Sequence, residues 1–169
     1  MPKRLILFVC TANICRSPMA EGVLRKLLKD EGLDTAFEID SVGTHDYQIG
    51  KPPFVTAIEA AKRRGYDIDH LVSRKIRPHD FDQFDFILGM DKLNIKNLKT
   101  IAPTRSKQKI ELLLEYGDKY HGKDIPDPYG REEKDFELAM NMIEDGCKGF
   151  VEVLRTMVSR KTGSPPSRG

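Results

Sequence analysis

The chain has 169 residues, of which 39% are hydrophobic and 32% charged, and its formal net charge is +2. This size and composition predict one soluble globular domain with a core of its own. The basic residues are spread along the chain, which argues against a nucleic-acid surface, and no apolar run is long enough to cross a membrane. An odd number of cysteines and no secretory leader are typical of a cytoplasmic protein with free thiols.

Strand-like and helix-like segments alternate along the chain. The apolar run 5–9 predicts a buried parallel strand, and apolar residues at helical spacing from Ala20 to Leu28 predict the helix after it, with Ser17 as its cap and Pro18 in its first turn. The later segments predict, in order, a strand at 37–43, a helix at 55–65, strands at 84–90 and 109–113, and a long helix whose apolar face runs from Phe136 to Leu154.

This alternation predicts an α/β fold with a four-stranded parallel sheet and helices on both faces. We expect a single domain over residues 1–157, with a phosphate-binding loop after the first strand. The tail at 158–169 is poor in apolar residues and is predicted to be disordered.

The stretch CTANICRSP, from Cys10 to Pro18, joins the first strand to the first helix. A lone cysteine after an apolar run is usually a buried core residue. Here, however, the loop ends at a helix N-terminus, where free amides and the helix dipole favour an anion. A thiol in that field loses its proton easily, and Arg16 offers a planar pair of donors that matches a phosphate. The combination predicts phosphoryl transfer with Cys10 as the nucleophile.

The chain resembles the low-molecular-weight protein tyrosine phosphatases. Cys-x5-Arg-Ser near the start and Asp-Pro-Tyr-Gly at Asp127 are similar to two family motifs, and the resemblance reaches to about Leu154. It implies that Cys10 is the nucleophile, that Arg16 binds the phosphoryl group, and that the enzyme also hydrolyses simple aryl phosphates. The phosphate-binding loop would comprise Thr11, Ala12, Asn13, Ile14, Cys15 and Ser17.

The resemblance also implies a set of loop supports. Ser17 would donate to the thiolate, and Asn13 would hold an unusual backbone conformation with the help of Ser17, Ser41 and His70. Asn is among the few residues that tolerate a positive φ, which agrees with that role. Many family members have Gly where this chain has Ala12. Glycine adopts a positive φ freely and alanine does not, so if the loop requires a positive φ at this position, Ala12 would cost about 1 kcal/mol.

Asp127 belongs to the sequence IPDPYG, which alone is most often a β-turn. Paired with the cysteine loop, it predicts a general acid that protonates the phenolate leaving group and then activates water to hydrolyse a phosphocysteine. Tyr129 and, by resemblance, Tyr47 would wall a slot that admits phosphotyrosine but is too deep for phosphoserine. Many relatives have Trp at the position of Tyr47 and some have an aromatic residue at Gly130, so this slot is expected to be more open.

Asp91 follows a strand end in the sequence GMDKLN. It either orients Arg16 or caps the next helix, and the cap is slightly favoured. Cys15, five residues after the nucleophile, is either small filler or a thiol that forms a reversible disulfide with oxidised Cys10.

No cofactor and no metal are expected. The four histidines are scattered without ligand spacing, and the loop lacks the Gly-Lys-Ser/Thr ending of nucleotide-binding loops. The expected partner is a phosphotyrosine-containing protein, with a tyrosine kinase as one candidate, and the expected product is inorganic phosphate.

Three alternatives remain open. A thioredoxin-coupled arsenate reductase would need two resolving cysteines, whereas only Cys147 lies beyond the loop, on the apolar face of the last helix. A phosphoarginine phosphatase typically has Thr at the position of Ile14. A non-catalytic phosphopeptide-binding module is disfavoured by the joint presence of Cys10, Arg16 and Asp127.

Overall fold

A parallel sheet of four strands, in the order β2-β1-β3-β4, forms the centre of the computed structural model, which describes residues 2–161. Its strands are β1 (Arg4–Cys10), β2 (Phe37–Gly43), β3 (Phe86–Gly89) and β4 (Ile110–Leu112). All pairs are parallel, which confirms the predicted sheet. The second strand has the predicted bounds, whereas the third and fourth are shorter than predicted.

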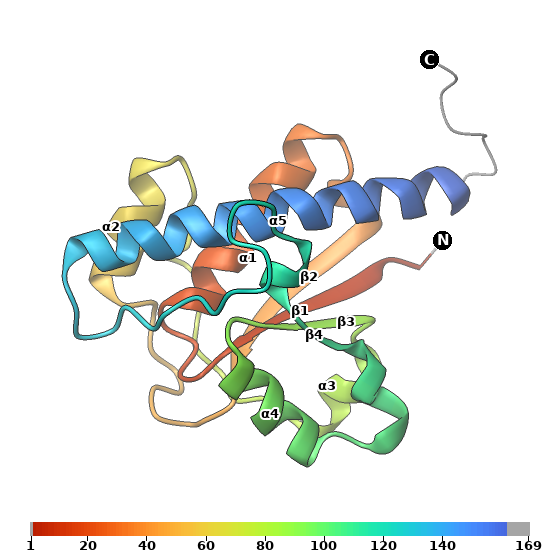
Figure 1. The fold of residues 1–169 in the computed structure, drawn as a ribbon, viewed down its shortest axis with the longest axis horizontal. Helices are drawn as coiled ribbons and strands as arrows, with labels where there is room; N and C mark the ends of the chain where they lie inside the picture. Colours follow the sequence, from red (N-terminus) through yellow and green to blue (C-terminus); the bar gives the residue numbers. More distant parts are fainter. Residues whose placement is uncertain (1, 162–169) are drawn as a thin grey trace.

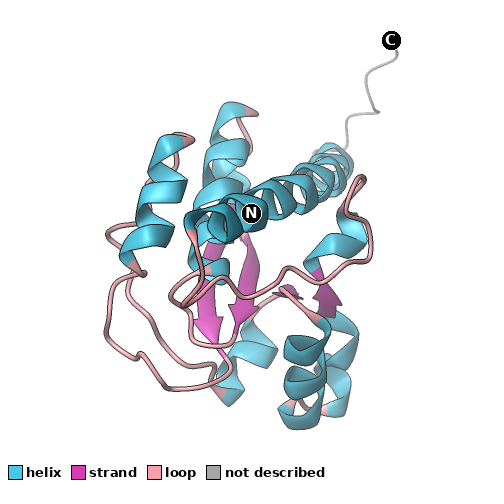
Figure 2. Cartoon of the chain, turned by 60° about the vertical axis from the view of Figure 1, so that its left-hand side comes forward, coloured by secondary structure: helices cyan, strands magenta, loops and turns pink. Residues whose placement is uncertain are grey.

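Helices cover both faces of this sheet, as predicted (Figure 1 and Figure 2). One face carries α1 (Arg16–Asp30), α2 (Val55–Arg63) and α5 (Glu133–Lys161), and the other carries α3 (Pro78–Gln83) and α4 (Lys92–Ile101). Short 3₁₀ helices lie at η1 (Asp34–Ala36), η2 (Thr104–Lys109) and η3 (Leu113–Tyr116). Within the described residues, no helix is long and apolar enough to span a membrane.

The alternating side chains of β1 supply both layers of the core. Ile6 and Phe8 pack into the cluster beneath α1 and α5, and Leu7 and Val9 pack into the cluster on the α3 and α4 side. All four are fully buried. A strand buried on both faces reads as a continuous apolar run, which is why the first strand could be recognised from residues 5–9.

The start of α1 differs from the prediction. The helix begins at Arg16 with Cys15 as its N-cap residue, and no side chain caps it. Ser17 therefore lies inside the first turn, not before it, because its buried hydroxyl is used in the loop rather than at the helix end. The helix starts two residues earlier than a Ser17 cap would allow.

The last helix also extends further than predicted. Its apolar face, from Phe136 to Leu154, is fully buried as expected. It continues to Lys161, so residues 158–161, expected to be disordered, are helical. Met157 and Val158 pack against the core, which gives the extra turn a reason to form. The rest of the expected tail, 162–169, lies outside the described residues.

Candidate active site

The site lies where β1 and β2 end side by side. Cys10 is the last residue of β1 and pairs with Gly43, the last residue of β2. A Cβ atom at Gly43 would lie 2.7 Å from the carbonyl oxygen of Thr11. A side chain there would push the loop away, so the glycine lets β2 support the first residues after Cys10.

The loop carbonyls are hydrogen-bonded to the segments around the loop. The carbonyls of Cys10 and Thr11 accept from the backbone amides of Thr44 and His45 at 2.9 and 3.0 Å, and the Ile14 carbonyl accepts from an amide at 2.8 Å. The Ala12 carbonyl accepts from the Ser73 hydroxyl at 2.9 Å. In a trans peptide the N–H points opposite to the C=O. The amides that follow these carbonyls therefore turn away from the supporting segments, toward the loop interior.

Asn13 has a φ of 59° and is the single non-glycine residue with positive φ among the described residues. Its amide nitrogen donates to Ser17 Oγ at 2.8 Å and to Ser41 Oγ at 3.0 Å, as the resemblance implied. Its Oδ1 accepts from the Arg74 backbone amide at 3.1 Å. Ala12 has no positive φ, so the strain considered for that residue does not arise.

His70 does not support the loop, contrary to the prediction. Its side chain is exposed, and Nδ1 lies 3.8 and 3.9 Å from carboxylate oxygens of Asp67 and Asp69. The Arg74 amide takes the acceptor of Asn13 instead, because the backbone on either side of Lys75 is hydrogen-bonded to Gly43 and is held against the loop. The side chains of Asp67, Asp69 and His70 lie close enough together to hold a metal ion, but exposed acidic clusters of this kind are common without one.

The thiol of Cys10 lies 3.0 Å from the hydroxyl of Ser17. A hydroxyl at this distance can donate to a thiolate and stabilise its charge. The neighbouring thiol of Cys15 is also buried, and burial together with the nearby Cys10 raises the pKa of Cys15 well above its usual range. Cys15 therefore stays protonated near neutral pH.

The guanidinium of Arg16 is almost fully buried and is held from one side. Its Nη1 donates to Asp91 Oδ2 at 2.6 Å and to the Ile125 carbonyl at 2.9 Å. Burial alone would lower the pKa of Arg16, but the charges of Cys10 and Asp91 more than offset this and raise it. Within the described chain Nε of Arg16 has no hydrogen-bond partner although it is buried. This donor is therefore left for a bound anion.

Asp91 performs both of the roles weighed from the sequence. Its Oδ1 accepts from the Asn94 backbone amide at 2.7 Å and caps α4. Its Oδ2 holds Arg16. One carboxylate has two oxygens, so the cap and the contact with Arg16 do not compete.

Asp127 lies on an exposed turn across from Arg16. The Tyr129 backbone amide donates to its Oδ1 at 3.2 Å, and its Oδ2 lies 3.7 Å from Nη2 of Arg16. Gly130 has a φ of 78°, which a side chain would make costly, so this turn favours glycine over the aromatic residue of some relatives. Asp127 thus forms the turn through Oδ1 and faces Arg16 through Oδ2, so the β-turn and the expected catalytic function are compatible.

Cys10, Arg16 and Asp127 line one cavity of about 240 Å³. It brings together most of the predicted site, namely Cys10, Thr11, Ala12, Ile14, Cys15, Arg16, Tyr47, Asp127 and Tyr129. Asn13, Ser17 and Ser41 form the hydrogen-bonded support beneath the loop. Tyr47 stacks on His45 with 4.9 Å between ring centroids, and Tyr129 packs edge-on against Phe54 at 5.2 Å.

The family model described as low molecular weight phosphotyrosine protein phosphatase matches residues 5–160. The chain belongs to this family. A relative named "Low molecular weight phosphotyrosine protein phosphatase" from Gallus gallus is 42% identical over 149 residues, which cover 87% of this chain and 93% of the relative. YfkJ of Bacillus subtilis, named a low molecular weight protein-tyrosine-phosphatase, is 38% identical over 85% of this chain and 90% of its own.

Solved structures of protein tyrosine phosphatases share the fold. A crystal structure of a protein tyrosine phosphatase from Entamoeba histolytica, with Hepes in its active site, superimposes with a TM-score of 0.88 at 34% identity. The match covers 91% of this chain and 98% of that one. Wzb of Vibrio vulnificus in complex with benzylphosphonate matches with a TM-score of 0.78 at 33% identity, over 89% and 99% of the two chains.

Several residues in and around this cavity were not predicted from the sequence. Gln48 lines the cavity beside Tyr47. Ser73 and the Arg74 amide hold the loop from a distant segment. Glu21 is buried among the apolar residues of α1 and accepts from Ser41 at 2.7 Å. Of these residues, only Glu21 could have been suspected from the sequence, because a carboxylate directly beside the apolar stripe of a helix is unusual and indicates a buried partner.

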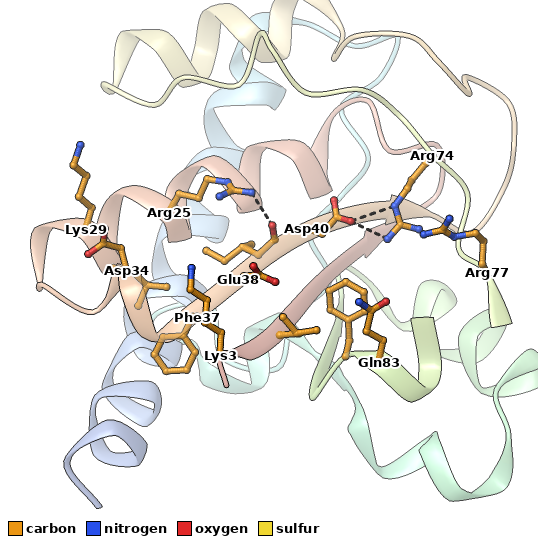
Figure 3. Close-up of a pocket in the computed structure, with 14 residues that line it drawn as sticks. Lys3, Arg25, Lys29, Asp34, Phe37, Glu38, Asp40, Arg74, Arg77 and Gln83 are labelled. Carbon is orange, nitrogen blue, oxygen red and sulfur yellow. Dashed lines mark hydrogen bonds and ion pairs between the residues drawn. The ribbon is translucent and has the colours of Figure 1, made fainter. Parts of the chain in front are cut away.

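A larger concavity of about 740 Å³ lies beside β2 and is lined also by residues of α1 (Figure 3). None of the predicted catalytic or loop residues line it. It is walled by charged side chains, including Arg25 and Arg74, and Arg74 forms an ion pair with Asp40 at 2.8 Å there. Arg74 also contacts the fully buried Asp80 at 3.0 Å, so its charge is balanced within the fold.

Proposed function

We propose that this chain hydrolyses phosphotyrosine in proteins through a phosphocysteine intermediate. The observation that carries the proposal is a single cavity in which the Cys10 thiol, the Arg16 guanidinium and the Asp127 carboxylate meet. The inward amides of the loop and Nε of Arg16 supply donors for the three equatorial oxygens of a phosphoryl group. In phosphoryl transfer, such positioning and charge stabilisation supply most of the catalysis.

In the first step, the thiolate of Cys10 attacks phosphorus. The S–P bond forms as the bond from phosphorus to the phenolic oxygen breaks. Asp127 in its protonated form gives its proton to that oxygen, so the product leaves as neutral tyrosine. Arg16, held by Asp91 on the far side, stays in place while the negative charge of the phosphoryl oxygens is redistributed.

In the second step, water attacks the phosphocysteine. Asp127, now a carboxylate, takes a proton from the water as the new P–O bond forms. The S–P bond breaks and returns the electron pair to sulfur, where the hydroxyl of Ser17 stabilises the thiolate. Inorganic phosphate leaves, Asp127 ends protonated, and the cycle begins again without a cofactor.

The walls of the cavity favour an aryl phosphate. The rings of Tyr47 and Tyr129 flank it, and Ile14 forms a branched apolar edge. Wzb of Vibrio vulnificus binds benzylphosphonate, in which an aromatic ring is joined to a phosphonate group through one carbon. A phosphotyrosine side chain has the same combination of a flat ring and a tetrahedral anion.

The alternatives gain no support from the site. The Cys147 side chain is fully buried in the core and does not line the cavity, whereas arsenate reduction would require a pair of resolving cysteines beyond the loop. Ile14 offers no hydrogen-bond partner to a phosphoarginine. We further propose that the protein acts in the cytoplasm on a phosphotyrosine-containing protein, with a tyrosine kinase as one candidate.

Hydrolysis of matched peptides that carry phosphotyrosine, phosphoserine or phosphoarginine, in buffer with EDTA, tests the proposal. We expect turnover of the phosphotyrosine peptide and of p-nitrophenyl phosphate, and no turnover of the phosphoserine peptide. Cys10→Ser should abolish both activities, and rapid quenching of the wild-type enzyme should trap phosphate on Cys10. Faster turnover of phosphoarginine, or full activity of Cys10→Ser, would contradict the proposal.

A further inference from the structure

A continuous line of hydrogen bonds runs from the Cys10 thiol to a buried carboxylate. Ser17 Oγ lies 3.0 Å from Sγ, and Asn13 Nδ2 donates to Ser17 Oγ at 2.8 Å and to Ser41 Oγ at 3.0 Å. The Ser41 hydroxyl donates to Oε1 of Glu21 at 2.7 Å. The line therefore ends on the Glu21 side chain in α1.

The direction of each bond in this line follows from a donor-only group, the Asn13 NH2, and an acceptor-only group, the Glu21 carboxylate. A carboxylate can only accept, so the Ser41 proton points to Glu21 and the oxygen of Ser41 is free to accept from Asn13. Asn13 uses both amide hydrogens as donors, so the oxygen of Ser17 is an acceptor as well. The remaining Ser17 proton is then available to sulfur, which is nearer than the alternative acceptor, the Val42 carbonyl at 3.3 Å.

Glu21 is paired with one cation, Arg25. Arg25, one turn along α1, donates to Oε2 through Nη2 at 2.7 Å and through Nε at 3.2 Å. Arg25 is also fixed to β2, because Nη2 donates to the Ile39 carbonyl at 2.7 Å. Burial raises the pKa of Glu21 overall, and the bonds to Arg25 and Ser41 offset this only in part. Within the described residues, no other cation pairs with Glu21.

We propose that the Arg25–Glu21 ion pair is a positioning element of the reaction, which orients the Ser17 hydroxyl toward the Cys10 thiolate. This role presupposes the proposed one of Cys10 as the nucleophile. Arg25 touches neither the substrate cavity nor the loop. It acts through four side chains, and its own side chain is half-exposed in the large concavity beside β2 (Figure 3).

Loss of Arg25 disfavours the thiolate whichever way Glu21 responds. A buried carboxylate without its cation tends to take up a proton. A protonated Glu21 holds the Ser41 hydroxyl less firmly, and the Asn13 amide that Ser41 accepts from is then less firmly placed against Ser17. If Glu21 stays charged instead, its uncompensated charge opposes a second negative charge on sulfur. Arg16 and Asp127, the charged residues that line the cavity with Cys10, are not altered by the substitution.

Arg25→Met tests this role, with Lys29→Met as the matched control. Lys29 is one turn further along α1 and lines the same concavity, but within the described residues it forms no ion pair. We expect Arg25→Met to slow alkylation of Cys10 by iodoacetamide at pH 6 by about tenfold, the effect of one hydrogen bond to a charged group. The pH profile of alkylation should move to higher pH. Turnover of p-nitrophenyl phosphate should fall similarly, mainly in kcat, and Arg25→Lys should recover part of both.

The Glu21→Gln background separates positioning from folding. If Arg25 acts through Glu21, adding Arg25→Met to Glu21→Gln changes alkylation no more than Lys29→Met changes it in the wild type. Circular dichroism and Tm check that each variant is folded. An Arg25→Met enzyme with the wild-type alkylation profile, or equal losses for Arg25→Met and Lys29→Met, would overturn the inference. A wild-type enzyme inactive on p-nitrophenyl phosphate would instead overturn the proposed function.

Discussion

Replacing Asp91 with serine should separate its two contacts. Serine is a good N-cap residue and can still accept from the amide at the start of α4. Its side chain is too short to reach Arg16, which Asp91 now holds at 2.6 Å. The variant therefore keeps the helix cap and loses the ion pair.

The expected loss of activity follows from the contacts of Arg16. Its Nη1 keeps the Ile125 carbonyl at 2.9 Å but loses a hydrogen bond to a charged group that is only 18% exposed. Such a bond contributes about 1.5–3 kcal/mol. At 1.36 kcal/mol for each factor of ten, kcat/KM should fall by roughly 10- to 150-fold. The guanidinium remains in the site, so the activity should not vanish.

Asp91→Ala is the companion variant, because it loses both contacts. It should match Asp91→Ser in kcat/KM on p-nitrophenyl phosphate but lose about 1 kcal/mol more stability, since alanine does not cap a helix. The free energy of unfolding from urea titrations measures the second effect. The reasoning fails if Asp91→Ser keeps wild-type activity, or if activity follows stability across the two variants.

Three further predictions concern the cavity itself. Asp127→Ala should lower kcat for phosphotyrosine by roughly 10²–10⁴-fold, with a smaller loss for phenols that leave easily, and equal losses across a leaving-group series would remove Asp127 from the acid role. Ile14→Thr should narrow the preference for phosphotyrosine over phosphoarginine, and an unchanged ratio would show that this side chain does not set it. Peroxide should form a Cys10–Cys15 disulfide that dithiothreitol reverses and inorganic phosphate slows. Mass spectrometry that finds Cys10 as sulfinic acid beside a free Cys15 thiol would refute protection by Cys15.

The loop from Cys10 to Ser17, with Cys10 as its candidate nucleophile, could be predicted from the sequence because its residues are adjacent in the chain. Cys10 and Arg16 are separated by only five residues, and the strand and helix on either side have clear apolar patterns. The left-handed backbone of Asn13 was implied by the family resemblance, and asparagine is among the few residues that tolerate it. Asp127 was recognised because its turn residues are adjacent in the chain. For such features, neighbours along the chain are also neighbours in space.

The supports of the loop depended on the tertiary structure. The partner of Asn13 is an amide 61 residues away rather than the side chain of His70. Arg16 is held by Asp91, 75 residues later, and Ser41 lies 20 residues from Glu21. Backbone amides carry no side-chain signature, and one carboxylate can serve as a cap, an ion-pair partner or both. Which of these occurs depends on how the ends of parallel strands pack together, and that is determined only when the sheet has formed.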